Sequence, residues 1–344
     1  MTSGAVTALA AAAHERWFIP SEDYPVRWGD LLEPSNLVAT VAAAGVAAIV
    51  TAVWLFRRRE PVVPGPLALG ATPERLALLL GWVPFLLAAH VAVPLLVSGV
   101  EGRLFVPNLT LALPARAFAG VLEIAVALLL FYGLFARAAG VALAALWALG
   151  LLIFGPTLLL EQAIVLGFAF FFFAVGRGPV AVDRVFGPWA GAREDLLPAA
   201  VPVLRIATGA SIAFTAFTEK LANVPLGVAF LEAYPKADVL QGMGLGTSHA
   251  TFVLVAGAVE LALGLLLVTG AFPRMTILVL WLPSNLTLTL FGWRELVGHL
   301  PIYAVMALLL LWGSGGRVYL EALRAGLIPL AQKPVGAGVR REGR

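Results

Sequence analysis

The stretch AGVLEIAVALLLFYGLFAR at residues 119–137 returns as AGAVELALGLLLVTGAFPR at residues 256–274. The offset of 137 (256 − 119) holds without a gap over residues 118–178 and 255–315. Leucine and alanine matches are common in an apolar chain, whereas a glutamate, an arginine and several glycines matching in register are not. The identical positions, numbered in the first copy, include Ala119, Gly120, Glu123, Ala125, Leu128, Leu129, Leu130, Gly133, Phe135, Arg137, Gly176 and Gly178. The sequence therefore predicts a duplicated module.

The composition places this module in a membrane. Of the 344 residues, 60% are hydrophobic and 12% are charged. A helix that crosses the hydrocarbon core of ~30 Å needs about 18 consecutive apolar residues. Nine apolar runs lie at about 37–56, 76–98, 117–134, 138–157, 162–176, 199–217, 251–270, 275–292 and 299–313, of which the fifth and the ninth are short. Because lipid offers no partner to a bare backbone, we expect an all-α polytopic membrane protein.

Each module holds four of these runs, and an even number makes both copies enter the membrane in the same direction. We therefore expect a parallel repeat of two four-helix bundles, preceded by one leading helix. The predicted parts are an outer segment (1–35), the leading helix (36–59), the first module (60–178), a cytoplasmic linker (179–198), the second module (199–316) and a basic tail (317–344).

The distribution of basic residues predicts the orientation. Arg57, Arg58 and Arg59 directly follow the first apolar run, which places the end of that run in the cytoplasm. Fifteen Lys and Arg residues then face the cytoplasm and seven face outward. We expect a multi-pass protein of the cell inner membrane with its N-terminus outside and its C-terminus in the cytoplasm.

The outer N-terminal segment allows two interpretations. The Ala-rich residues 8–13 would suit a signal peptidase, and cleavage after Ala13 would leave His14 as an N-terminus able to bind copper. The alternative is an uncleaved tail whose aromatic side chains rest at the lipid–water boundary. Those side chains are Trp17, Phe18, Tyr24 and Trp28.

Charges inside the apolar runs mark a candidate site, because such charges are costly and usually paired. Glu123 and Glu260 lie at similar depths in the outer halves of equivalent helices. Lys220 at the outer end of the second module predicts a Lys220–Glu260 ion pair. The first module offers His90 as the partner of Glu123. These pairs are either structural or part of a site for a quinone head group or for proton transfer.

The second module carries more titratable groups than the first. His299 stands where the first module has Gln162, and Asn285 follows Pro283 at a point where the helix could unwind. A quinol needs an acceptor for each hydroxyl proton, and we expect Glu260 and His299 to be these acceptors. Lys220 and Asn285 are the predicted binding partners, together with His90 and Glu123 of the first module. Glu219, Arg294 and Glu295 are predicted at the rim.

Other chemistries find less support. The chain has no cysteine, which excludes disulfides, thiol relays, iron–sulfur clusters and covalently attached haem. Its four histidines show no metal-ligand spacing and no matched pair for haem, so we expect a quinone rather than a haem or a metal. No basic run suits nucleic acid. Arg137 and Arg274 are predicted to anchor tight turns to lipid phosphate.

A scattered set of small and charged residues resembles the DoxX/DoxD-like family of four-helix membrane proteins. In the second module the set comprises Arg205, Gly209, Phe214, Lys220, Ala256, Gly257, Glu260, Gly264, Gly270 and Arg274. The likeness covers residues 75–178 and 205–315. It implies a quinone-linked membrane subunit that works with a redox partner, since family members are linked to thiosulfate:quinone oxidoreduction. The duplication, the leading helix and His90 in place of a lysine depart from the family pattern.

Three functions follow as hypotheses. The first is a DoxX-like membrane subunit of a quinone-linked oxidoreductase or electron-transfer complex, acting with a partner protein. The second is a non-catalytic scaffold or assembly factor that docks an exported protein through residues 14–35 and 218–250. The third is a carrier for a small anion or lipid that uses Lys220 and His90.

Overall fold

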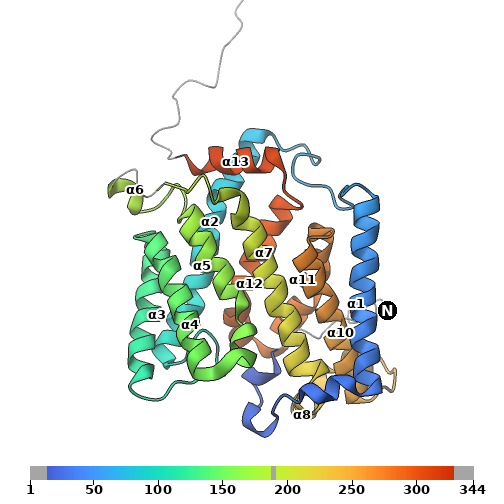
Figure 1. The fold of residues 1–344 in the computed structure, drawn as a ribbon. Coiled ribbons are helices and arrows are strands. Elements are labelled where there is room, and N and C mark those ends of the chain that lie inside the picture. The colour runs from blue at the N-terminus through green and yellow to red at the C-terminus, as the bar shows by residue number, and fades with distance from the viewer. Residues whose placement is uncertain (1–13, 187–190, 329–344) are drawn as a thin grey trace, which may run out of the picture.

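The computed structural model describes residues 14–186 and 191–328 (Figure 1). This part of the chain is helical, and its β pairing is one isolated bridge between Arg103 and Thr110. Eight of its helical segments are long and apolar enough to cross a membrane, which confirms the all-α multi-pass fold. They are α1 (Pro34–Phe56), α2 (Pro73–Glu101), α3 (Ala115–Tyr132), α4 (Ala136–Leu160), α7 (Leu197–Thr215) continued by η5 (Ala216–Leu221), α10 (His249–Thr269), α11 (Pro273–Phe291) and α12 (Trp293–Trp312).

The fifth predicted run forms a shorter helix, α5 (Ala163–Val175). Its 13 residues rise about 20 Å, less than the hydrocarbon thickness. Helix α5 packs between α4 and α7, and this packing buries most of its phenylalanines. Because protein rather than lipid covers it, α5 need not span the full hydrocarbon thickness. The nine predicted runs thus correspond to eight long helices and one short one.

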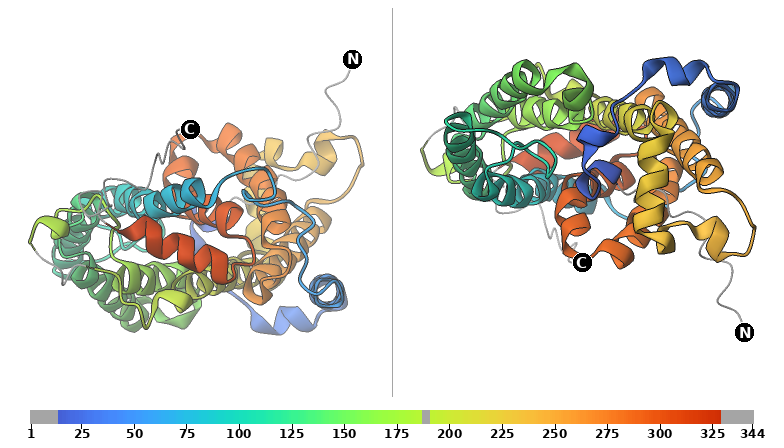
Figure 2. Two further views of the ribbon diagram at one scale, coloured as in Figure 1. Left: turned by 90° about the horizontal axis from the view of Figure 1, so that it is seen from above. Right: turned by 90° about the horizontal axis from the view of Figure 1, so that it is seen from below.

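Eight helices form a closed ring in the order α2, α3, α4, α5, α7, α10, α11 and α12 (Figure 2). Each helix packs on the next, and α12 returns to pack along α2. The first and last helices of each module thus pack on the other module, α5 on α7 and α12 on α2. The expected pair of four-helix bundles is therefore two half-rings, because an open arc of four helices leaves apolar edges that the second arc buries.

Helices α1 and α13 (Arg317–Leu327) lie outside this ring. The leading helix α1 packs along α10, and its other faces are largely exposed. The amphipathic helix α13 (Arg317–Leu327) lies across one end of the ring against α2 (Figure 1). Gly81 and Gly326 make this contact close, since a Cβ on Gly326 would lie 2.1 Å from the backbone oxygen of Ala77.

The duplication extends to the backbone conformation. The same positive φ angles recur at the offset of 137 residues, including the φ of a phenylalanine that begins the third helix of each module. A left-handed conformation is uncommon for a side chain of this size, so its recurrence is independent evidence for the repeat. The matching pairs are Gly133 and Gly270, Phe135 and Phe272, Gly155 and Gly292, Gly176 and Gly313, and Gly178 and Gly315.

The arginines after these turns have hydrogen-bond partners within the protein. Arg274 is buried and donates hydrogen bonds to the carbonyls of Leu310 and Leu311 at the end of α12. Its equivalent Arg137 donates to the carbonyl of Gly191. Arg274 thus satisfies carbonyls at the end of α12, where a helix leaves acceptors that lipid cannot satisfy. Anchoring of either arginine to lipid phosphate stays a prediction.

A glycine crossing fixes the distance between α7 and α10. A Cβ on Gly209 of α7 would lie 2.6 Å from the carbonyl oxygen of Gly264 on α10. Small residues allow such close approach of two membrane helices. This contact brings Lys220, in the η5 continuation of α7, into reach of Glu260 on α10.

Candidate functional site

The N-terminal segment enters the helix ring between the two modules (Figure 2). The short helix η1 (Glu15–Trp17) has all three side chains buried, each less than 8% exposed. Trp17 lies against Gly298 of α12, where a Cβ would come within 2.1 Å of the indole. The prediction that Trp17 rests at the lipid boundary is therefore wrong. The predicted alternative of cleavage after Ala13 concerns residues 1–13, which lie outside the described residues.

Lys220 joins two carboxylates within the ring, at the end where η1 enters. Its Nζ lies 3.1 Å from Oε2 of Glu260, which confirms the predicted ion pair. It also lies 3.0 Å from Oε2 of Glu15, a partner that the sequence argument missed. All three side chains are buried. A buried ammonium between two carboxylates satisfies charges that would otherwise be costly in the membrane.

Arg16 organises a second group of acids beside the first. Its Nε lies 3.4 Å from Oε1 of Glu161 and 3.9 Å from Oε1 of Glu219. Glu219 accepts a hydrogen bond of 2.7 Å from the Glu15 amide, so it holds η1 in place. Glu219 is only 1% exposed, and its predicted position at the rim is wrong.

A π-helical turn presents these groups to the interior. The turn η5 continues α7 and carries Thr218, Glu219 and Lys220 in succession, all of them buried. Thr218 donates a 2.6 Å hydrogen bond to Glu161 of the first module. Such wider turns within α-helices occur frequently at functional sites. Here the turn lets adjacent residues of one helix reach partners on η1, α10 and the first module.

His299 lies at the inner edge of the same group and is 3% exposed. Its Nδ1 is 3.4 Å from Oε1 of Glu295, one helical turn earlier on α12. Its ring lies 5.6 Å from that of His14 and 5.7 Å from that of Trp17. Glu295 was predicted at the rim but is fully buried. Arg294 does lie at the surface, where it donates to the carbonyl of Trp17.

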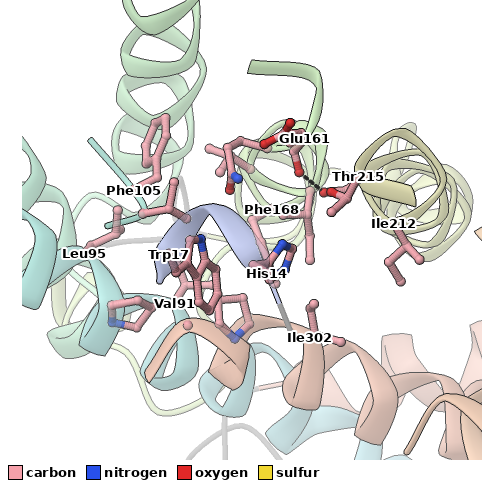
Figure 3. A pocket seen from close by; sticks show the side chains of 18 of the residues that line it. His14, Trp17, Val91, Leu95, Phe105, Glu161, Phe168, Ile212, Thr215 and Ile302 are labelled. Carbon is pink, nitrogen blue, oxygen red and sulfur yellow. Dashed lines mark hydrogen bonds between the residues drawn. The ribbon is translucent and has the colours of Figure 1, made fainter. Parts of the chain in front are cut away.

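Two adjoining cavities open among these side chains, and we call them together the lumen. The larger, of about 80 Å³, has apolar walls that include Trp17, Phe105 and Phe168 (Figure 3). The smaller, of about 30 Å³, is lined by Lys220, Glu260 and His299. Both share the same four lining residues, His14, Ile212, Thr215 and Ile302. The lumen thus combines an apolar chamber with a titratable end.

Two titratable groups of the lumen lie outside the spanning helices. Burial, reinforced by the nearby Lys220 ammonium, lowers the pKa of His14 to about 4, so His14 is neutral at physiological pH. Burial and then the charge of Glu219 raise the pKa of Glu161 above its ordinary range, against the opposing effect of Arg16. A carboxyl of this kind can hold and release a proton near neutral pH.

Three predicted binding residues have other partners. Asn285 donates a hydrogen bond to the Trp281 carbonyl of its own helix. The neighbouring Ser284, rather than Asn285, lines the lumen. His90 Nδ1 lies 2.8 Å from the carbonyl oxygen of Leu86. The predicted His90–Glu123 pair is wrong, because Glu123 instead accepts a 2.8 Å hydrogen bond from the Phe105 amide.

The two repeated glutamates nevertheless have related roles. Glu123 holds the loop that brings Phe105 to the wall of the lumen. Glu260 holds Lys220, which in turn holds Glu15 of the inserted segment. Each glutamate therefore helps to fix a segment that lies outside the long helices, which gives both copies of this residue a structural role.

No family model, curated protein or solved structure matches this chain. The resemblance to DoxX/DoxD-like proteins therefore stays a prediction.

Proposed function

We propose that this chain is a DoxX-like, quinone-binding membrane subunit of an oxidoreductase or electron-transfer complex. In this proposal it lies in the cell inner membrane with its N-terminus outside, and a partner protein supplies the redox centre. The observation that carries the proposal is the lumen, where an apolar chamber adjoins buried Lys220, Glu260 and His299.

The chemistry of a quinone fits this combination. Its ring is flat and apolar, and the indole of Trp17 and the ring of Phe168 offer flat surfaces in the larger cavity. Its oxygens exchange two protons when it is reduced or oxidised, and Glu161, Glu260 and His299 are buried groups able to take part. The two electrons pass to or from a haem, flavin or iron–sulfur centre of the partner.

The first experiment is extraction and mass spectrometry of small molecules from protein purified in mild detergent. We expect stoichiometric quinone in the wild type and its loss in Glu260→Gln. The fold should survive this change, because Lys220 keeps Glu15 as a counter-ion. Glu232→Gln, which changes an exposed carboxylate near the same end, is the matched control and should retain quinone.

The opposing result is equally clear. Absence of quinone from the wild type, and from protein reconstituted with added ubiquinone, would contradict the proposal. Equal quinone in the wild type and Glu260→Gln would leave a quinone protein but remove Glu260 from the site.

Two rival functions receive less support. An anion carrier would need an available cation, but Lys220 lies between two carboxylates, and buried acids outnumber buried bases around the lumen. A scaffold that docks an exported protein through residues 14–35 would have to use the exposed later part of this segment, because residues 15–17 are buried within the ring. Liposome flux without a partner would revive the carrier. Loss of function on deletion of residues 236–247, with Glu260→Gln harmless, would favour the scaffold.

A further inference from the structure

Glu295 has an unusual environment for a carboxylate. It lies in the first turn of α12 and is 0% exposed. Neither of its carboxylate oxygens has a well-formed hydrogen bond within the described residues, and the nearby Thr287 hydroxyl stabilises its ionised form only in part. An ionised carboxylate buried with so little compensation is costly, so this group requires a proton or a cation beside it.

His299 is the nearest source of that proton. Its Nδ1 lies 3.4 Å from Oε1 of Glu295 and likewise has no hydrogen-bond partner among the described residues. A proton on Nδ1, directed toward the carboxylate, would give His299 Nδ1 and Glu295 Oε1 a shared hydrogen bond. Since Nδ1 is turned to Glu295, Nε2 is the ring nitrogen available to a molecule in the cavity that His299 lines.

We propose that Glu295 and His299 form a proton-accepting dyad for the molecule that occupies the lumen. His299 meets the oxygen of that molecule, and Glu295 is the positioning residue that takes up the proton passed through the imidazole. The identity of the molecule, a hydroquinone, rests on the proposed function. A carboxylate that contacts one nitrogen of a histidine orients the ring and raises the basicity of the other nitrogen, which is an established arrangement for proton transfer.

The proton step balances without any other reactant. The O–H bond of the hydroquinone breaks as the Nε2–H bond of His299 forms. The Nδ1–H bond of the imidazole breaks as an O–H bond forms on Glu295. The imidazole is neutral before and after the step, while the negative charge moves from Glu295 to the ligand oxygen. Quinone reduction runs the same transfers in reverse.

The first module provides an internal comparison. The positions equivalent to Glu295 and His299 are Leu158 and Gln162, each 137 residues earlier, and neither can accept a proton. Gln162 lines the larger cavity, so a glutamine is accommodated at this depth of the fold. The dyad therefore belongs to the second module alone, and His299→Gln with Glu295→Leu would recreate the chemistry of the first.

Other titratable groups also face the dyad and can affect the His299 signal. They come from the inserted segment, from the π-helical turn, from α10 and from α12 itself. They are His14, Glu15, Glu219, Lys220, Glu260 and Tyr303. A change in the His299 signal is therefore assigned to Glu295 only where substitution of Glu295 removes it.

The test uses nitrogen-15 NMR of histidine-labelled full-length protein in lipid nanodiscs. The chain has only four histidines, so His299→Gln identifies the His299 signals by their loss. Without ligand, we expect the neutral tautomer with the proton on Nδ1 in the wild type, and loss of this preference in Glu295→Gln. On addition of decylubiquinol, the wild-type signal should shift toward the Nε2-protonated tautomer. Glu295→Gln should not show this shift, and Glu232→Gln should behave as the wild type.

The outcomes separate the two proposals. An unchanged His299 tautomer in ligand-free Glu295→Gln would overturn the dyad. Decylubiquinol that binds without shifting the His299 signal would overturn its role as acceptor and leave the quinone proposal intact. No binding of decylubiquinol by the wild type would overturn the proposed function and, with it, the ligand assigned to the dyad. If Glu295→Gln fails to fold, Glu295→Leu, which matches Leu158, replaces it in the same comparison.

Discussion

At the scale of single residues, buried charge gathers at the end of the ring that the N-terminal segment enters. The pairing of Lys220 with Glu260 could be predicted, because both charges lie at similar depth within one module. The contributions of Glu15 and Arg16 could not, since residues 14–18 have neither helical nor strand periodicity. One signal was available. Glu219 and Lys220 are adjacent and both required partners, while Glu15 and Arg16 offered the complementary pair on the same side of the membrane.

Lys220→Met is expected to lower the free energy of unfolding by about 3–5 kcal/mol, because Glu15 and Glu260 would remain buried without their shared cation. Lys236→Met removes an exposed lysine near the same end and should change it by less than about 0.5 kcal/mol. Denaturant titration in mixed micelles measures both values. Equal stability of the two variants would show that the buried network contributes nothing.

The protonation of His14 predicts a pH dependence. Its pKa in the folded protein is lowered from 6.5 to about 4 by burial, followed by the effect of Lys220. The unfolded chain therefore binds the proton more readily between these values, and stability falls as the pH drops from about 6.5 to 4. His14→Gln should lose less thermal stability than the wild type between pH 7.5 and pH 5. Parallel losses in both proteins would exclude His14 as the cause.

At the scale of elements, the insertion of η1 between the modules is the feature that builds the site. A short polar segment would ordinarily stay at the membrane surface, and the aromatic residues around it supported that interpretation. Its burial depends on tertiary partners from α7, α10, α12 and the turn before α5, which no local pattern reveals. The apolar helices themselves could be predicted, because run length and hydropathy are local properties.

Gly298→Ala is expected to displace the indole of Trp17 and to destabilise the protein by about 1–3 kcal/mol, since the new Cβ would lie 2.1 Å from the ring. Gly45→Ala on α1 is the matched control, because a Cβ there meets nothing within 4 Å. Thermal unfolding of both variants makes the comparison. In a Trp17→Ala background the cost of Gly298→Ala should largely disappear, and a full cost in that background would refute the contact.

At the scale of the whole molecule, the repeat was predictable but the closed ring was not. Matching Glu, Arg and Gly residues at one offset predict two modules, and the similar positive φ angles of Phe135 and Phe272 agree with this prediction. Whether two modules stand apart or close on each other depends on which helix edges pack, and apolar edges look alike in sequence. The contacts of α5 with α7 and of α12 with α2 decide it.

The absence of cysteine allows a direct test of the predicted orientation. Glu22→Cys lies in the exposed N-terminal segment, and Glu321→Cys lies on α13 at the opposite end of the ring. A membrane-impermeant maleimide applied to spheroplasts should label Glu22→Cys at once and Glu321→Cys only after lysis. Labelling in the reverse order would invert the protein in the membrane and place the lumen in the cytoplasmic leaflet.

The most direct test of the central claim is a cryo-electron microscopy map of the protein in lipid nanodiscs with added ubiquinone. The account predicts density for a quinone ring in the lumen, between Trp17 and Phe168, with its oxygens toward the side of Glu161, Glu260 and His299. A map that places ubiquinone elsewhere, or that shows only water in the lumen at saturating ubiquinone, would contradict it.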